Sequence, residues 1–348
     1  MIKNFKIGSY RGLQALELAE LENINIFVGP NNCGKTSILE AIVLSGVFEN
    51  VELLVETLVS RYHGFNTEYF ESLFPIDKKP VICLKSMLDD EKILHTHLVY
   101  QKSQSINKEE PTHISNVFEL QFSYRYDGIS EDEKPDMFKV RFEETEYKFN
   151  VELGKASQNI LDIQIPCQFV SFSRYSDSKE LIENVDKVLD QNLRNELVEI
   201  LNIFDPAIEN FEIIGKGRTI KIFKRTEKTP LTLYDYGNGM YKAFYIATAA
   251  LLAKNGVLLV DEIEAGIHSK ALTDFIAKLL KVCMDNNVQL FLTTHSLEAI
   301  DIILDDCRDH LEKTAIYYIK NKEQKTIAKR YCGRKLLGLR NEIGFDVR

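Results

Sequence analysis

The N-terminal part of the chain alternates short apolar runs with turns, and it predicts strands followed by a helix. Residues 2–7 place apolar side chains among polar ones, and Arg11-Gly12 marks a turn. Residues 23–28 (Asn-Ile-Asn-Ile-Phe-Val) favour a strand that stops at Gly29. From Thr36 the apolar residues recur at helical spacing, which predicts a helix, and residues 51–61 predict a second one.

The pattern changes over residues 79–151, where short alternating runs are separated by polar stretches that contain Pro or Gly. These runs predict an antiparallel β lobe inserted after the first helices, and residues 168–172 predict a further strand. Residues 178–204 carry apolar side chains at helical spacing. They fit one long helix or a short helical hairpin, and either could pack on the core or project as an arm.

The C-terminal part alternates helical and fully apolar segments. Residues 211–222 predict two short strands, and predicted helices 240–254, 269–284 and 296–305 alternate with apolar strands 256–260 and 288–292. This order is typical of a parallel sheet covered on both faces. The sequence therefore predicts an α/β fold with a mostly parallel sheet, an N-terminal antiparallel β lobe and a short helical arm. The predicted segments are residues 1–78, 79–175, 176–210 and 211–348.

Composition narrows the class of protein. The 348 residues are 45% hydrophobic and 27% charged, a balance typical of globular proteins, and no apolar run approaches the length of about 20 residues that a membrane helix needs. The N-terminus lacks an apolar signal segment, so we expect a cytoplasmic protein without membrane contact. The six cysteines have no zinc-site or redox spacing and are expected to be free thiols.

The net charge of −9 excludes a generally basic nucleic-acid surface. The charge is uneven, because the segment from Ala315 to the end holds nine Lys or Arg against three acidic residues. Such a basic tail fits either a solvated charged face or a surface that binds nucleic acid or an acidic partner.

The strongest motif is residues 29–37, Gly-Pro-Asn-Asn-Cys-Gly-Lys-Thr-Ser, between a predicted strand and a predicted helix. Its glycines let the backbone N–H groups and the helix N-terminus face a phosphate. We call this segment the phosphate loop. Lys35 is expected to reach the β- and γ-phosphates, and the Thr36 hydroxyl is expected to bind Mg²⁺. The predicted phosphate-contacting residues are Gly29, Asn31, Asn32, Cys33, Gly34, Lys35, Thr36 and Ser37.

Two further motifs follow buried strands. Asp261 and Glu262 come directly after the apolar residues 257–260, at the strand end where an open α/β sheet binds ligands. We expect Asp261 to bind the metal and Glu262 to activate the attacking water. His295 follows the strand 288–292 and is expected to hydrogen-bond the γ-phosphate or the same water.

A glycine-rich segment opens the predicted helix 240–254. Residues 236–242, Tyr-Gly-Asn-Gly-Met-Tyr-Lys, place glycines at a helix N-terminus, where free N–H groups suit an anion. Since the phosphate loop already serves the chain's own nucleotide, this second site suggests a nucleotide held by another subunit. The predicted contacts are Gly237, Asn238, Gly239 and Met240.

Taken in this order, the motifs resemble those of the ABC-type ATPase heads of the RecF/SMC/OLD group. The sequence is most similar to the stand-alone AAA-family ATPases of bacterial phage-defence and OLD-like systems. Residues 29–37 resemble Walker A, 236–242 a degenerate signature motif, 261–262 Walker B, 264–270 the D-loop region, and His295 the switch histidine. Residues 9–12, Ser-Tyr-Arg-Gly, look like the family's Phe-Arg-Gly turn. We call residues 236–242 the signature segment.

This resemblance implies a function. It implies an Mg²⁺-dependent ATPase that binds ATP and works as homo-oligomers built on head-to-tail dimers, with the signature segment closing on the partner's ATP. About 50 residues follow His295, too few for a Toprim nuclease domain, so the expected effector is a separate protein, plausibly a Toprim-like nuclease in anti-phage defence. The alternative is a RecF-like DNA-repair ATPase that clamps DNA on ATP binding. A nucleotide-dependent scaffold and a small-molecule kinase are weaker alternatives.

Overall fold

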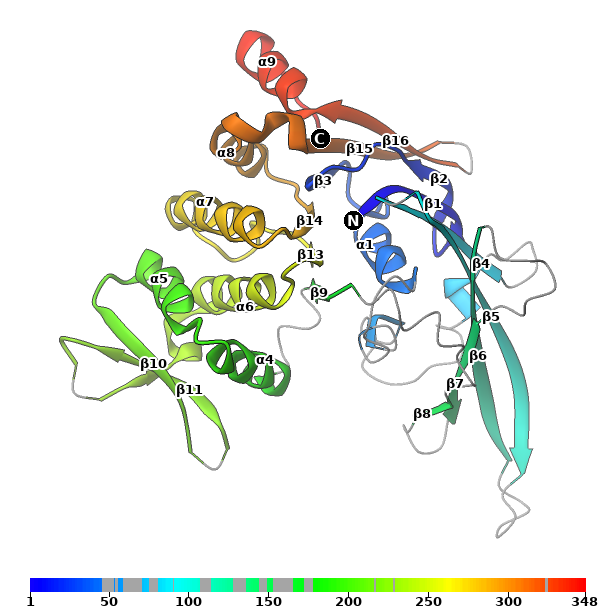
Figure 1. Ribbon diagram of the computed structural model, residues 1–348, viewed down its shortest axis with the longest axis horizontal. Coiled ribbons are helices and arrows are strands. Elements are labelled where there is room, and N and C mark those ends of the chain that lie inside the picture. The colour runs from blue at the N-terminus through cyan, green and yellow to red at the C-terminus, as the bar shows by residue number, and fades with distance from the viewer. Residues whose placement is uncertain are drawn as a thin grey trace. The chain divides into compact units, whose positions relative to one another are not determined.

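The contacts of the chain form two compact units, and each is described by itself. The structure is a computed structural model, shown in Figure 1. Unit 1 comprises Met1–Leu21, Asn31–Ile165 and Ile319–Ala328, and unit 2 comprises Glu22–Pro30, Pro166–Tyr318 and Lys329–Arg348. The residues that the structure describes are 1–45, 53, 56–58, 71–74, 81–89, 91–106, 114–127, 136–143, 149–152, 165–171, 178–215, 217–227, 229–322 and 325–348.

Unit 1 contains a seven-stranded antiparallel sheet with the order β2-β1-β4-β5-β6-β7-β8. Its strands are β1 (Ile2–Tyr10), β2 (Leu13–Leu18), β4 (Val81–Leu88), β5 (Ile93–Ile106), β6 (Ile114–Tyr126), β7 (Asp136–Glu143) and β8 (Phe149–Glu152). Buried residues alternate with more exposed ones along β4, as expected when one face of a strand packs on a core. The predicted antiparallel lobe is confirmed, and β1 and β2 belong to the same sheet.

Unit 1 also contains the helix α1 (Lys35–Leu44), which begins at the predicted position after the phosphate loop. Eight of its residues besides Lys35 are buried, since apolar side chains occupy most of its circumference. The second predicted helix, over residues 51–61, falls mostly outside the described residues. Only Leu53 and residues 56–58 of that segment are described, and they are helical.

Unit 2 is built on a six-stranded sheet with the order β16-β15-β3-β14-β13-β9. Its strands are β3 (Ile24–Val28), β9 (Cys167–Val170), β13 (Val257–Val260), β14 (Gln289–Thr293), β15 (Thr314–Lys322) and β16 (Lys325–Cys332). The end of β15 from Ile319 and the start of β16 up to Ala328 belong to unit 1. The pairs β9–β13, β13–β14, β14–β3 and β3–β15 are all parallel. Every residue of β3, β13 and β14 is buried, so both faces of these strands are covered, as the sequence predicted.

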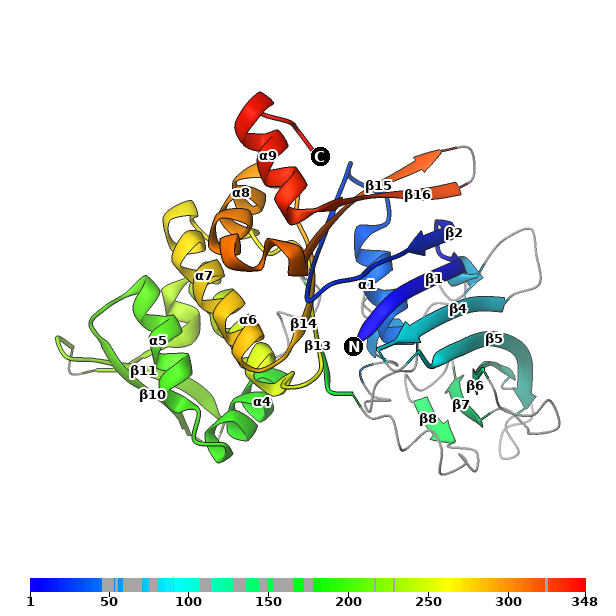
Figure 2. The same cartoon turned by 45° about the horizontal axis from the view of Figure 1, so that its top comes forward.

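Helices cover one face of this sheet, as Figure 1 and Figure 2 both show for α6, α7 and α8. The helices of unit 2 are α4 (Ser178–Asp190), α5 (Arg194–Phe204), η3 (Leu233–Tyr236), α6 (Asn238–Leu252), α7 (Ser269–Asp285), α8 (Leu297–Asp306), η4 (Arg308–Lys313) and α9 (Gly333–Ile343). A small antiparallel sheet of β10 (Ile208–Ile214), β11 (Thr219–Lys224) and β12 (Leu231–Thr232) completes the unit.

Helix α6 lies in the centre of unit 2, in contact with α4, α5 and α7. Its apolar residues extend around most of the helix, so all but three of its 15 residues are buried. The segment that the sequence left open is therefore a helical hairpin, α4 and α5, packed on the core. It does not project as an arm.

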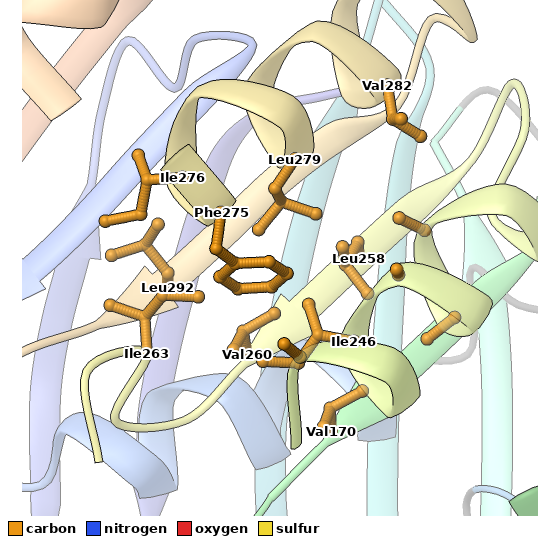
Figure 3. Close-up of a cluster of buried hydrophobic side chains, with 14 of the residues drawn as sticks. Val170, Ile246, Leu258, Val260, Ile263, Phe275, Ile276, Leu279, Val282 and Leu292 are labelled. Carbon is orange, nitrogen blue, oxygen red and sulfur yellow. The ribbon is translucent and has the colours of Figure 1, made fainter. Parts of the chain in front are cut away.

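The core beneath α6 and α7 is a continuous apolar cluster. Figure 3 shows Phe275 of α7 between side chains of the sheet, with Val260 of β13 and Leu292 of β14 close by. Ile246 of α6 and Leu258 of β13 extend the same cluster. Burial of such side chains contributes about 1.5–3 kcal/mol each, which fixes the positions of the strand ends that carry the predicted motifs.

The basic segment from Ala315 forms β15, β16 and α9, and β15 pairs with β3 inside the sheet. The four-segment division of the chain stays a prediction. Among the described helices, none combines the length and the apolar character that crossing a membrane requires.

Candidate functional site

Three predicted motifs leave neighbouring parallel strands of unit 2 at the same edge. Gly29 follows β3, Asp261 follows β13, and Thr294 follows β14, which lies between those two strands. The register confirms the alignment, because Leu292 pairs with both Ile26 and Val260. The carboxyl edge of a parallel sheet is where such folds bind ligands.

A single hydroxyl organises the residues that follow β13. Thr293 Oγ1 donates to Asp261 Oδ1 at 2.6 Å and accepts from the backbone N–H of Glu262 at 2.8 Å. Asp261 and Thr293 are both buried. The hydroxyl therefore fixes the orientation of the Asp261 carboxylate and the path of the chain into Glu262. Thr293 is not among the predicted site residues, and its only signal in the sequence is its place between a buried strand and the predicted switch histidine.

The carboxylate of Glu262 and the ring of His295 lie close together. His295 Nε2 is 3.8 Å from Glu262 Oε1, and the two side chains are 36% and 46% exposed. This separation exceeds a direct hydrogen bond, and the exposure leaves both groups accessible to water. Glu262 has a φ of 49°, in the left-handed region that residues other than Gly rarely adopt. Such backbone strain clusters at functional sites.

Glu264 connects the two loops that carry Glu262 and His295. Its Oε1 accepts a hydrogen bond of 2.7 Å from the backbone N–H of His295. Its Oε2 is buried without a hydrogen-bond partner in the part of the chain that the structure describes. The sequence placed Glu264 only in the D-loop region, so this contact was not foreseen. We call residues 261–267, which contain all three carboxylates, the acidic loop.

The signature segment begins α6 in a form suited to an anion. The N-cap is Gly237, with a φ of 90° that a residue with a side chain rarely adopts, and no side chain caps the helix. No acidic residue lies in the first turn, so the positive end of the helix dipole is not neutralised there. A Cβ atom at Gly239 would lie 2.6 Å from the carbonyl oxygen of Gly266, so only glycine fits this contact with the acidic loop.

Helix α1 in unit 1 also begins at a glycine N-cap without a side-chain cap. Its N-cap is Gly34, with a φ of 97°, and its first turn also has no acidic residue and no side-chain cap. A Cβ atom at Gly34 would lie 2.5 Å from Leu13 Cδ2, so this leucine would have to move, and the positive φ of Gly34 disfavours any side chain here. Asn32 has a φ of 62°, which together with Gly34 curls the loop into the helix.

Lys35 and Cys33 of the phosphate loop are buried in unit 1. Lys35 Nζ lies 3.9 Å from Cys33 Sγ. Burial raises the pKa of the Cys33 thiol, and the nearby Lys35 partly offsets this rise. The thiol is therefore protonated at neutral pH, and Cys33 acts as a small apolar residue of the loop.

The structure therefore groups the predicted residues by unit. Asp261, Glu262 and His295 lie together at the sheet edge of unit 2, and residues 237–240 form the start of α6 in that unit. Gly29 also belongs to unit 2, whereas the predicted residues from Asn31 to Ser37 belong to unit 1. The catalytic, phosphate-binding and metal-binding roles of all these residues stay predictions.

Comparisons with known proteins agree on the class of domain. A family model described as "AAA domain, putative AbiEii toxin, Type IV TA system" matches residues 24–301. The chain is similar to a Helicobacter pylori protein named ATP/GTP phosphatase, with 23% identity over 367 residues and 97% of both chains covered.

The chain is also similar to two solved SMC heads. One is an SMC head bound to the C-winged helix domain of ScpA, with 13% identity, a TM-score of 0.50, and 97% of this chain and 99% of that chain covered. The other is an SMC head with an extended coiled coil bound to the C-terminal domain of ScpA derived from Pyrococcus furiosus. It has 10% identity, a TM-score of 0.50, and 99% of both chains covered. At these identities the likeness shows the fold alone.

Proposed function

The chain belongs to the family of AAA domains described as putative AbiEii toxin of type IV TA systems, and we propose that it is a two-headed ATP switch for a separate effector protein. It is an ATPase of AAA type with the α/β fold of an SMC- or ABC-type head. The observation that carries the proposed catalytic site is the contact of Thr293 with both Asp261 and Glu262 beside His295.

The nucleotide phosphates would bind at the phosphate loop. The glycine N-cap of α1, the absence of an acidic residue in its first turn, and the adjacent Lys35 all suit a polyphosphate. The proposed Mg²⁺ ligands are the Thr36 hydroxyl in unit 1 and the Asp261 carboxylate in unit 2. This donor set fits Mg²⁺, which usually binds one or two carboxylates and keeps several waters. When bound, Mg²⁺ neutralises charge on the phosphates.

The proposed base is Glu262. Its carboxylate is accessible to water and lies 3.8 Å from His295 Nε2, a spacing that allows one water molecule to contact both groups. In this arrangement Glu262 orients the attacking water and accepts its proton, while His295 hydrogen-bonds the γ-phosphate or the water. Thr293 and Glu264 act by position, since they hold the backbone of these two residues.

The proposed assembly is a head-to-tail dimer. The uncapped start of α6 offers a second anion site within one chain, which suits the γ-phosphate of a nucleotide bound to a partner subunit. ATP then stabilises the closed pair, and hydrolysis releases it, because ATP binds the closed state more tightly than the open one.

The effector is proposed to be a separate protein, and a Toprim-like nuclease in anti-phage defence is the specific candidate. Two similarities support a partner. The matching family is described as a putative toxin of a type IV TA system, and the similar SMC heads are bound to ScpA domains.

The test compares the wild type with Glu262→Gln for ATP turnover and for mass by light scattering with and without Mg-ATP. We expect Glu262→Gln to bind ATP, to lose at least about 100-fold in turnover, and to accumulate as an ATP-dependent dimer. Lys35→Ala should lose nucleotide affinity. Turnover at the wild-type rate in Glu262→Gln would refute its assignment as base, and a monomer in every state would refute the two-headed switch.

A further inference from the structure

Lys242 of α6 places its ammonium group against the acidic loop. The side chain is only 4% exposed. Its Nζ donates to the carbonyl oxygen of Glu262 and, at 3.0 Å, to that of Ala265. One cation thus bridges two carbonyls of the same loop, and it comes from the helix that the signature segment begins.

The loop that Lys242 holds is tightly turned. The backbone N–H of Ala265 donates to the carbonyl of Glu262 at 2.9 Å, and that of Ile267 donates to Glu264 at 3.2 Å. Glu262 itself has the left-handed φ of 49°. A strained residue persists only where its surroundings over-determine it. The contact with Lys242 is one such constraint, and it acts on the carbonyl of the residue proposed as base.

The carboxylates of the acidic loop partly offset the cost of burying a cation at this position. Burial lowers the pKa of Lys242 to about 8, while the charges of Glu264, Glu262 and Asp261 oppose that change. The side chain therefore remains mostly charged at neutral pH. Burying an ammonium group is costly, and an apolar side chain of the same length would fill the same space. Packing alone therefore does not explain a lysine at this position.

The same helix touches the acidic loop a second time, because Gly239 packs against the carbonyl of Gly266. Gly239 and Lys242 are three positions apart on α6 and so lie on the same side of the helix. The contacts of Gly239 and Lys242 with the acidic loop together connect the helix and the loop more rigidly than either contact would alone.

We propose that Lys242 is a positioning residue that couples the start of α6 to Glu262. Binding of a ligand at residues 237–240 would thereby affect the position of the Glu262 carboxylate, which is proposed to face the attacking water. This inference rests on the proposed function, since it takes Glu262 as the base and the start of α6 as the site of the partner's nucleotide. Lys242 does not touch the reacting atoms in this proposal.

The test is Lys242→Met, which keeps the length of the side chain and removes its donors and charge. The matched control is Lys254→Met, an exposed lysine just beyond the C-terminal end of the same helix. For Lys242→Met we expect kcat to fall at least about tenfold while KM changes by less than about threefold. Binding of a fluorescent ATP analogue and the thermal midpoint should stay close to those of Lys254→Met.

A second measurement separates coupling from assembly. In the Glu262→Gln background, Lys242→Met should still form the ATP-dependent dimer, because residues 237–240 are untouched. A Lys242→Met protein with the wild-type kcat overturns the proposal. Equal loss of kcat and of dimer formation also overturns it, since that pattern indicates a role in assembly.

Folding controls keep the result decisive. If Lys242→Met does not fold, Lys242→Gln is measured with the same expectations. If neither variant folds while Lys254→Met does, Lys242 has a purely structural role and the proposal is overturned. Failure of the proposed function is read separately, from Glu262→Gln. An inactive Glu262→Gln beside a fully active Lys242→Met refutes only the coupling.

Discussion

At the scale of single residues, one buried hydroxyl connects the predicted metal ligand to the predicted base. Thr293 donates to Asp261 and accepts from the backbone of Glu262, so it satisfies both polar groups in a region without bulk water. Buried polar groups that lose such a partner carry the full cost of their desolvation. The geometry of the site therefore depends on a residue that makes no predicted contact with nucleotide.

Thr293→Val tests this role because valine keeps the shape and removes the hydroxyl. We expect a loss of about 1–3 kcal/mol in the free energy of unfolding, together with a fall in kcat, since the Asp261 carboxylate and the Glu262 N–H each lose their hydrogen bond to this hydroxyl. Urea unfolding and steady-state ATP turnover measure the two effects. The control is Thr248→Val, whose buried hydroxyl donates to Phe244 within its own helix. Equal turnover in the two variants would contradict the positioning role.

At the scale of elements, the Ser-Tyr-Arg-Gly turn is attached to the helix that follows the phosphate loop. Arg11 Nε lies 2.9 Å from Glu40 Oε2 of α1, and Tyr10 donates to the same oxygen at 3.1 Å. The Glu40 side chain is only 2% exposed and that of Arg11 11%. Together with Leu13 beside Gly34, this ion pair fixes α1 against the β1–β2 hairpin within unit 1.

Arg11→Ala should destabilise the protein strongly. Removing one partner of a buried ion pair costs about 3–5 kcal/mol, because the buried Glu40 carboxylate loses an opposite charge. Lys6→Ala is the matched control on β1, since the Lys6–Glu17 pair at 2.8 Å is about half exposed and such pairs contribute about 0–1 kcal/mol. Urea unfolding of both variants gives the comparison. A loss in Arg11→Ala no larger than in Lys6→Ala would show that Glu40 is not held by this pair.

At the scale of the whole molecule, the charge of the chain bears on the alternative of a DNA clamp. The net charge is −9, and the segment from Ala315 to the end is locally basic, with nine Lys or Arg against three acidic residues. In the structure, four of the tail arginines form ion pairs. Arg330 pairs with Glu22, Arg334 with Glu312, Arg340 with Asp301, and Arg348 with Asp346. Guanidinium groups engaged in this way contribute less to a phosphate-binding surface.

We therefore expect DNA binding no tighter than the range of about 10⁻⁴–10⁻⁶ M typical of non-specific contacts at physiological salt. Fluorescence anisotropy with a duplex oligonucleotide at two salt concentrations, with and without ATP, measures this affinity. The control is a triple variant with Glu at Lys320, Lys322 and Lys325, three exposed lysines of the tail. Nanomolar, strongly salt-dependent binding that this variant abolishes would instead favour the RecF-like DNA clamp.

The sequence by itself determined the elements and the order of the motifs. Local periodicity located α1, α6, α7 and α8 and the strands β3, β13 and β14 within a few residues, because each carries an apolar pattern that only one kind of element can bury. The phosphate loop and the pair Asp261-Glu262 were predicted for a similar reason, since each motif consists of neighbouring positions in the chain. The local pattern did not decide between one long helix and a helical hairpin over residues 178–204, because both would bury the same apolar side chains.

Only the tertiary structure decided which residues support the site. Thr293 and Asp261 are 32 positions apart in the chain, and Lys242 is 20 and 23 positions from Glu262 and Ala265, whose carbonyls it contacts. These contacts arise only because β13, β14 and α6 pack together. The pairing of β15 with β3 was likewise decided by the tertiary structure, because the apolar run 315–319 indicates a strand without indicating its neighbour in the sheet. Hydrogen bonds between distant residues follow from packing, which no local pattern encodes.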